Sequence, residues 1–308
     1  MRITNPSFEI WAQEPGLDGM YRQIERVGRV CYKSENHQTA DSARPFVERM
    51  MRNQHYAMLE HGTVYLLYAD DEATRQAAVG EGMPWQRYMA NKFSRVNCHS
   101  GKYYITTNLR VLAENQWMDD LGHLCEPLAQ HERRVAVHFT TQVAITREFN
   151  RHRADSMAEQ STRYCNYSKA KFGNEISVNL PVWVRREMEG TEWETLTDGE
   201  QVALSGQRLV ELARKVADGT ATAIDNWLFA NVAAEKAYMN LVEMGHKAQE
   251  ARVVLPLDTN TELVHTAFVS DWKHFFDLRA IGVTGMPHPD AKALAAPLHD
   301  AFKEMGLL

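Results

Sequence analysis

Basic side chains are concentrated in one short stretch of the chain, RHRADSMAEQSTR. Arg151, Arg153 and Arg163 carry planar guanidinium groups that fit phosphate or carboxylate. Only Asp155 and Glu159 lie in the same stretch to neutralise them. Three arginines against two carboxylates leave an excess of positive charge, which indicates a site for a bound anion. The alternative is a solvated, salt-bridged helix end, the commoner meaning of an isolated Arg-His-Arg.

A second group of candidate residues lies toward the C-terminus. The stretch QEARVVLP contains Arg252, and DWKHFFDLR contains His274 and Arg279. An arginine at the end of an amphipathic helix often only complements the helix dipole, so a structural and a functional meaning both remain open.

The stretch HYAMLEHG brings two histidines and a glutamate together in the sequence. His55 and His61 are separated by five residues, the last of which is Glu60. This spacing fits no standard zinc site, so we expect no metal. The four cysteines are widely spaced and form no Cys-x-x-Cys pair, which argues against zinc ribbons and thioredoxin-like redox sites.

Several nucleotide-binding and hydrolase motifs are absent from the sequence. There is no G-x-x-x-x-G-K-[ST] and no G-x-G-x-x-G after a strand. No G-x-S-x-G elbow surrounds Ser161, which is therefore not an obvious hydrolase nucleophile. A bound nucleotide would have to be held by arginines and not by a glycine-rich loop.

Composition and charge limit the possible partners. A chain of 308 residues with 44% hydrophobic residues can bury a substantial core. The net charge of −6 argues against a general nucleic-acid binder. No apolar stretch approaches the roughly 20 residues that span a membrane, and the N-terminal stretch MRITNPSFEIWAQEPG lacks the apolar region of a signal peptide. We therefore expect a cytoplasmic protein without nucleic-acid or membrane partners.

The elements that must position the candidate residues show both strand and helix periodicity. We expect strands at 61–69 and 134–142, a helix beginning near Val143, and helices at 42–54 and within 192–246. We also expect a short strand, a turn at Thr107-Asn108 and a helix over 102–116, and a strand followed by an amphipathic helix at 261–279. No Pro/Gly/Ser-rich linker divides the chain. The sequence predicts a mixed α/β or α+β class, with one compact domain over residues 1–308 and a central sheet flanked by helices.

The motifs, taken together, resemble those of a known family. RHRADSMAEQS matches the R-H-R-x7-S signature of the flavin-dependent thymidylate synthases, and TRYCNYSK extends the match. EARVVLP, a following Thr-Glu pair and DWKHFFDLR resemble its C-terminal motifs in order and spacing, while GRVCYKS and HYAMLEHG resemble its N-terminal ones. The extra length relative to compact members lies at about 70–133, where we expect a helical insert. The resemblance implies a homotetramer with active sites shared between subunits.

The resemblance also implies an activity. Members of the family make dTMP from dUMP, with methylenetetrahydrofolate as the one-carbon donor and NADPH as the source of electrons through FAD. Because the flavin supplies the electrons, no enzyme nucleophile is needed. Two alternatives remain open: a related C5 hydroxymethylation of a pyrimidine deoxynucleotide, and a non-catalytic nucleotide- or RNA-binding protein. The acidic net charge and the lack of an aromatic stacking motif argue against the second.

The resemblance assigns a first set of residues to the flavin and the folate. Arg-His-Arg would hold FAD together with the serine that follows, and two N-terminal residues would lie near flavin and folate. One histidine falls where compact members have a flavin-contacting asparagine. These residues are Arg151, His152, Arg153, Ser156, His55, Glu60 and His274.

A second set is assigned to dUMP. The phosphate and sugar would meet the turn that begins at Glu159, with Ser161 and Arg163 as donors and Arg252 arriving from another subunit. Arg279 would lie against the uracil ring and stabilise negative charge as N3 loses its proton, which makes C5 nucleophilic.

The chain departs from the family pattern at four positions of interest. Compact members commonly have Asn where this chain has Ala158, and Gln where it has Glu148. Phe268 and Ser270 stand where those members have Asn and Arg. We therefore expect other residues of this chain, in the long insert, to bind the parts of FAD that compact members bind through these positions.

Overall fold

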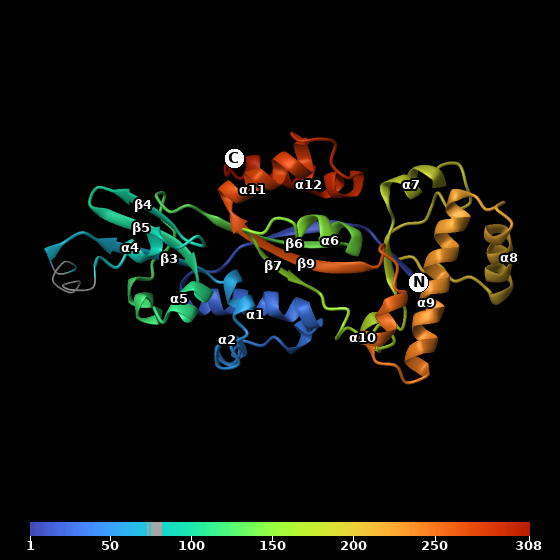
Figure 1. The fold of residues 1–308 in the computed structure, drawn as a ribbon, viewed down its shortest axis with the longest axis horizontal. Coiled ribbons are helices and arrows are strands. Elements are labelled where there is room, and N and C mark those ends of the chain that lie inside the picture. Colours follow the sequence, from blue (N-terminus) through green and yellow to red (C-terminus); the bar gives the residue numbers. More distant parts are fainter. Residues whose placement is uncertain (73, 75–81) are drawn as a thin grey trace.

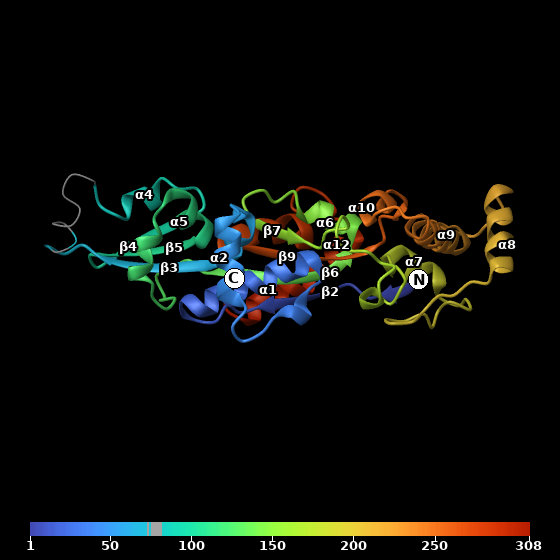
Figure 2. The same cartoon turned by 90° about the horizontal axis from the view of Figure 1, so that it is seen from below.

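The structure is a computed structural model that describes residues 1–72, 74 and 82–308. Its elements extend along one long axis, as Figures 1 and 2 show. A four-stranded sheet lies in the middle, a three-stranded sheet at one end and a helical region at the other. The mixed α/β class is confirmed. The outline is elongated, because two regions extend from opposite ends of the central sheet.

The described strands are short, apart from the two in the centre of the molecule. They are β1 (Arg2–Thr4), β2 (Ser7–Trp11), β3 (Thr63–Ala69), β4 (Arg95–His99), β5 (Lys102–Asn108), β6 (Arg134–Gln142), β7 (Ser156–Glu159), β8 (Ser177–Asn179) and β9 (Asn260–Phe268). The described α-helices are α1 (Gly16–Tyr32), α2 (Ala43–Arg52), α4 (Gln86–Met89), α5 (Leu109–Asn115), α6 (Val143–Phe149), α7 (Val182–Met188), α8 (Gly206–Ala217), α9 (Ala223–Glu243), α10 (Ala248–Ala251), α11 (Val269–Phe276) and α12 (Pro289–Glu304). None of the described helices is long and apolar enough to cross a membrane.

The central sheet has the strand order β2-β6-β9-β7, with antiparallel neighbours throughout. Successive side chains on a strand point to opposite faces. On one face, Val137 and Phe139 of β6 pack against Trp272 of α11 and against α12. On the other face, Ala136 and Val264 pack against α1. The long β6–β9 pair therefore lies between helices on both sides, which is why both strands are rich in apolar residues.

The insert differs from the helical one that the sequence suggested. Strands β4 and β5 form an antiparallel pair and join β3 in a sheet of order β3-β5-β4. Ile105 is fully buried on this sheet, and Tyr103 stacks on Trp85 with ring centroids 4.0 Å apart. The helix α5 follows β5 directly, since the Asn108 side chain accepts the backbone N–H of Val111 at 3.2 Å. Residues 73 and 75–81 of the insert lie outside the described part.

The opposite end of the molecule has a separate hydrophobic cluster. Strand β1 pairs in parallel with β8, and α7, α8 and α9 surround them. Ile3 and Val178 are fully buried there, beside Trp227 of α9. The helices expected within 192–246 are confirmed as α8 and α9. Because this cluster shares no buried residue with the central ones, it contributes to the elongated shape.

The Arg-His-Arg motif lies in the loop between α6 and β7. Strand β7 is an edge strand that pairs only with β9 in the described sheet. Because side chains alternate along a strand, Ser156 points to the α1 face of the sheet and Glu159 to the α6 face. The side chains of the motif therefore lie on both faces of β7, with Arg-His-Arg before the strand and Ser161 after it.

Candidate functional site

Arg279 connects the C-terminal motif to the Arg-His-Arg loop. It lies in the π-helical turn η6 (Asp277–Ile281) that follows α11. Its Nε donates to Nε2 of His152 at 3.3 Å. Its Nη1 donates to Oε2 of Glu148 at 2.5 Å, and its Nη2 donates to the Glu148 carbonyl oxygen at 2.6 Å. We call Glu148, His152, His274 and Arg279 the helix-side cluster.

The imidazole of His152 is buried and electrically neutral at neutral pH. Burial lowers its pKa to about 4, and the nearby His265 and Arg279 act in the same direction. The neutral ring can accept the hydrogen bond from Arg279 through Nε2. The His274 ring lies 5.8 Å away between centroids, so this histidine of α11 also belongs to the cluster.

The two acidic side chains of the motif are occupied by other partners. Asp155 contacts Nε2 of His265 at 2.7 Å, with both side chains almost fully buried. Glu159 accepts hydrogen bonds at 2.7 and 3.1 Å from a threonine of α6 and from the residue after that helix. Arg151 and Arg153 are exposed, and no carboxylate of the described residues forms an ion pair with either. The excess positive charge predicted from the sequence is confirmed for this part of the chain.

A second group of basic residues surrounds the turn that follows β7. The Ser161 backbone N–H donates to a carbonyl in the last turns of α1 at 2.9 Å. Arg163 donates through Nε to Gln249 at 3.2 Å, and Arg252 donates through Nη1 to the Thr162 hydroxyl at 3.2 Å. Both guanidinium groups are exposed and contact only neutral side chains. We call Ser161, Thr162, Arg163, Gln249 and Arg252 the turn cluster.

The position of Arg252 modifies the expectation taken from the family. The resemblance implies that another subunit contributes Arg252 to the dUMP site. In the structure, Arg252 of η5 (Arg252–Val254) already lies at the turn of its own chain. A second subunit is therefore not required to place an Arg252 guanidinium beside Arg163.

The two clusters lie at opposite ends of β7. Four strand residues at about 3.3 Å each separate them by roughly 13 Å along the strand. Among the described residues, no hydrogen bond or ion pair joins His152 or Arg279 to Ser161 or Arg163. One chain thus brings the predicted residues together as two groups and not as one.

Two predicted residues lie apart from both clusters. His55 is exposed at the start of η2 (Tyr56–His61). Glu60 forms an ion pair with Arg110 of α5, and its backbone carbonyl accepts from Arg134 at 3.0 Å. Their assignment to flavin and folate stays a prediction.

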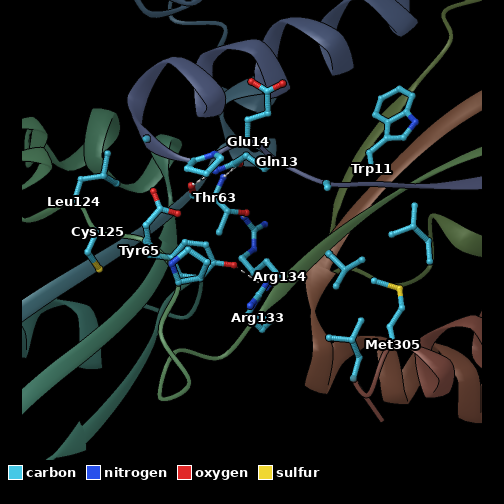
Figure 3. A pocket seen from close by; sticks show the side chains of 18 residues that line it. Trp11, Gln13, Glu14, Thr63, Tyr65, Leu124, Cys125, Arg133, Arg134 and Met305 are labelled. Carbon is cyan, nitrogen blue, oxygen red and sulfur yellow. Dashed lines mark hydrogen bonds between the residues drawn. The ribbon is translucent and has the colours of Figure 1, made fainter.

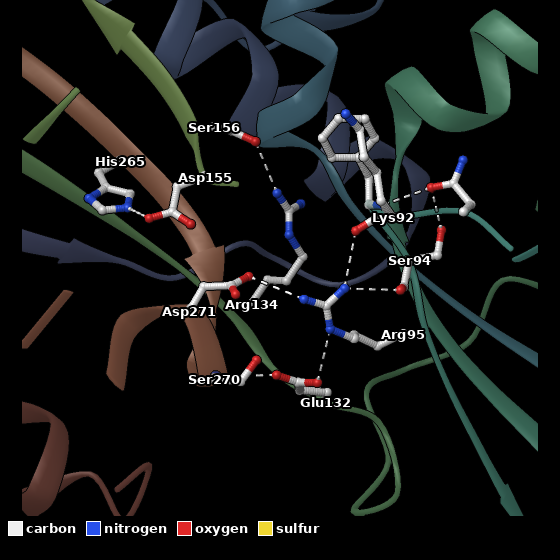
Figure 4. Close-up of polar contacts among 12 residues, drawn as sticks. Lys92, Ser94, Arg95, Glu132, Arg134, Asp155, Ser156, His265, Ser270 and Asp271 are labelled. Atoms are coloured by element: carbon white, nitrogen blue, oxygen red, sulfur yellow. Dashed lines mark hydrogen bonds and ion pairs between the residues drawn. The ribbon is translucent and has the colours of Figure 1, made fainter. Parts of the chain in front are cut away.

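Arg134 was missed by the sequence reasoning, although it lies against a motif residue. Figure 4 shows its guanidinium directed toward Ser156, the first residue of β7. Nη2 donates to the Ser156 hydroxyl at 3.2 Å, and Nη1 donates to the Thr63 hydroxyl at 3.3 Å. Burial lowers its pKa to about 10. The sequence did contain a signal for it: the pair Arg133-Arg134 directly precedes the apolar residues of the predicted strand at 134–142.

His61 lies on the same face of the central sheet as Arg134. Its Nδ1 is 2.8 Å from the Thr266 hydroxyl of β9, and its Nε2 is buried without a partner. Burial lowers its pKa to about 3, with Arg134 as the next cause. His61 is therefore a neutral residue at the junction of insert and central sheet.

The cysteines near the motif are poor nucleophiles. Cys165 is fully buried, and burial raises the pKa of its thiol. Burial also raises the pKa of Cys31 to about 11. Neither is a thiolate at neutral pH, so the motif offers no activated cysteine. In the described part of the chain, no three His, Cys, Asp or Glu side chains come together as metal ligands.

A pocket of about 200 Å³ lies between β2, the start of β6 and the loop around Cys125 (Figure 3). Gln13 closes one side, since its amide exchanges two hydrogen bonds of 2.8 Å with the Thr63 backbone. Arg134 and Trp11 contribute to the wall. No residue assigned to cofactor or substrate from the sequence lines this pocket.

The model of the family described as thymidylate synthase complementing protein matches residues 116–305. No curated protein matches the chain. Two solved structures of the UMP/dUMP methylase PolB from Streptomyces cacaoi, bound with 5-Br dUMP and with 5-Br UMP, are similar to it. Both are 15% identical, with TM-scores of 0.41 and 0.40, and the alignments cover 99% of this chain and 93% and 92% of those chains.

Proposed function

The chain belongs to the thymidylate synthase complementing protein family, and on this premise we propose that it is a flavin-dependent thymidylate synthase. It converts dUMP into dTMP, with methylenetetrahydrofolate as one-carbon donor and NADPH as reductant through FAD. The contact of Arg279 with His152 carries the proposal, since it joins the C-terminal motif to Arg-His-Arg across 127 positions of the chain.

The residues present fit an anionic flavin cofactor. Arg151 and Arg153 are exposed cations without carboxylate partners among the described residues. Nε of Arg134 and Nδ1 of His265 are buried polar atoms without partners, and both lie on strands that adjoin the motif. FAD, when bound, supplies the two electrons that convert a methylene unit into a methyl group. Arg151, Arg153 and Ser156 would hold it at the loop before β7.

Arg279 stabilises the uracil ring as it becomes negatively charged. A guanidinium has five N–H donors, and three of those in Arg279 are directed to His152 and Glu148. Nη1 and Nη2 each keep one N–H for a uracil oxygen. Because His152 is neutral, it orients the guanidinium without adding a competing charge. The donors are fixed before the substrate arrives, as electrostatic catalysis requires.

The turn cluster binds the phosphate of dUMP. Arg163 and Arg252 are exposed guanidinium groups with neutral partners, so neither must leave a carboxylate to bind a phosphate. The Ser161 hydroxyl accepts from the Arg163 backbone N–H at 3.3 Å and has its own O–H to donate. The substrate base and phosphate are thus recognised by separate clusters.

The roughly 13 Å between the clusters along β7 supports a shared active site. We propose a homotetramer in which the helix-side cluster of one subunit and the turn cluster of another enclose one dUMP. The exposed ring of Tyr164 beside the turn, 56% accessible, is consistent with a surface that another subunit covers.

The test is an absorption spectrum combined with product analysis. After incubation with FAD and removal of unbound FAD by gel filtration, the protein should absorb near 450 nm, and anaerobic NADPH should bleach this band. The product from dUMP should have the mass of dTMP. A hydroxymethylated product would replace the proposed reaction by the related C5 chemistry. A protein that stays colourless after incubation with FAD would exclude both and favour simple nucleotide binding.

A further inference from the structure

Arg134 is a half-buried cation whose hydrogen-bond partners are all uncharged. Its hydrogen-bond acceptors are the Glu60 carbonyl and the hydroxyls of Thr63 and Ser156. No carboxylate of the described residues forms an ion pair with it, and its Nε has no partner. Glu60, Asp155 and Asp271 act on the Arg134 charge only from beyond ion-pair distance, so an anionic ligand in direct contact with the guanidinium would stabilise the folded protein.

A second guanidinium, from the insert, faces the same aromatic ring. The Cζ atom of Arg95 lies 4.4 Å from the centroid of the Phe268 ring, and that of Arg134 lies 5.4 Å from it. Figure 4 shows both arginines between β4 and β9. Cations are attracted to the face of an aromatic ring, so Phe268 holds two positive groups near each other that would otherwise repel.

The carboxylates near Arg95 hold it loosely. Its Nη2 is 3.4 Å from Asp271 and its Nε is 3.7 Å from Glu132. Charge-assisted hydrogen bonds of this kind are ordinarily about 2.7–2.9 Å long. The Arg95 side chain is also 33% exposed. Arg95 can therefore exchange these long contacts for a closer anion without unfolding the strand that carries it.

The two arginines lie next to the loop assigned to the flavin, because Arg134 binds Ser156, three residues after Arg153. We propose that Arg95 of the insert and Arg134 of the central sheet bind the diphosphate of a dinucleotide, that of FAD. The inference rests on the proposed function, since it adds a cofactor subsite to the same enzyme. The proposal gives the insert a role, because the guanidinium of Arg95 on β4 lies beside Phe268 and Ser270. At these two positions the family pattern has Asn and Arg, which this chain lacks.

The first experiment is a flavin titration of the full-length apoprotein. Riboflavin lacks the diphosphate and the adenosine, so it reports the contacts of the isoalloxazine and ribityl groups alone. The Arg95→Ala variant should bind FAD roughly tenfold or more weakly than wild type, the loss expected for a hydrogen bond to a charged group, and should bind riboflavin with unchanged affinity. Lys102→Ala is the matched control, because Lys102 is an exposed cation at the other end of the same β4–β5 pair. An equal loss in both variants would overturn the proposal.

A second variant separates ligand binding from attachment of the insert. Asp271→Asn removes the ion pair with Asp271, as Arg95→Ala does, but keeps the guanidinium, with Glu132 as its remaining carboxylate partner. If Arg95 binds the diphosphate, Asp271→Asn should bind FAD as tightly as wild type or more tightly. If Arg95 only attaches the insert to α11, both variants should weaken FAD binding alike, and the proposal fails.

Titration with NADPH identifies which dinucleotide is bound. A loss of NADPH affinity in Arg95→Ala with unchanged FAD affinity would move the subsite to the reductant and overturn the assignment to FAD. Wild-type protein that binds neither FAD nor riboflavin would instead refute the proposed function itself. The two failures are therefore distinguishable.

Discussion

In the helix-side cluster, Arg279 is bound by a carboxylate and a buried neutral histidine, whereas in the turn cluster Arg163 and Arg252 contact only neutral side chains at the surface. The first arrangement is fixed by the hydrophobic core, because His152 also packs on Phe275 with ring centroids 5.0 Å apart. The second has no such support. The difference indicates that the helix-side cluster is organised before ligands arrive, while the turn cluster depends on a phosphate to complete it.

The largest effect is expected from Arg279→Ala. Removing a preorganised donor at a developing anion lowers turnover by roughly 10²–10³-fold, and flavin content should stay near that of wild type. Arg279→Lys should recover little, because an ammonium group cannot donate to both His152 and Glu148 while facing the ring. Rates of dTMP formation and absorbance of the bound flavin measure the two quantities separately. Equal losses in both would make Arg279 a structural residue.

Mixing two inactive variants tests whether each active site combines the helix-side cluster of one subunit with the turn cluster of another. Arg163→Ala and Arg279→Ala should each be nearly inactive. After reassembly in equal amounts, about one site in four combines an intact turn cluster with an intact helix-side cluster. Activity near a quarter of the wild-type rate is therefore expected. No recovery, with subunit exchange shown by native mass spectrometry, would assign both clusters of a site to one chain.

Ser161→Ala tests the turn cluster alone. Loss of a hydroxyl that bonds a charged phosphate costs about 1.5–3 kcal/mol of binding free energy, so the dissociation constant for dUMP should rise roughly 10- to 150-fold. Flavin affinity and the urea midpoint of unfolding should not change, because the Ser161 side chain lies outside the buried core. Isothermal titration with dUMP provides the measurement. A matching fall in stability would contradict the view that this turn is independent of the core.

The smallest effect is a difference in acid stability between the clusters. His152 has a pKa of about 4 in the folded protein and about 6.5 when unfolded. The unfolded chain therefore binds the proton more tightly, and stability is lost as the pH falls from 6.5 toward 4. At pH 5 the loss from this group is about 2 kcal/mol relative to pH 7. His152→Asn should flatten the pH dependence of the free energy of unfolding by this amount. Arg163→Ala, in the turn cluster, should leave the dependence unchanged.

Much of the secondary structure follows from the local sequence. Strand β6 and the start of α6 lie at 134–142 and Val143 as predicted, and β9 followed by α11 matches the expected strand and amphipathic helix. These segments are long and strongly periodic, and buried against helices. Strand β7 was missed, because an edge strand of four residues carries too little alternation to be seen in a sequence. In the insert, the strand and helix expected at 102–116 are confirmed as β5 and α5. Strand β4 was missed for a related reason, because a short strand of mostly exposed residues resembles a loop.

The sequence by itself determined the excess of positive charge around Arg-His-Arg, since that depends only on which residues are present. Tertiary structure decided how the charge is distributed. The carboxylate of Asp155 contacts His265 of β9, 110 positions away, and forms no ion pair with the motif arginines. Arg279 donates to Glu148, 131 positions away. Arg95 and Arg134 become neighbours only because the insert sheet packs against the end of β9. Contacts between distant segments depend on strand pairing and core packing, which no local pattern encodes.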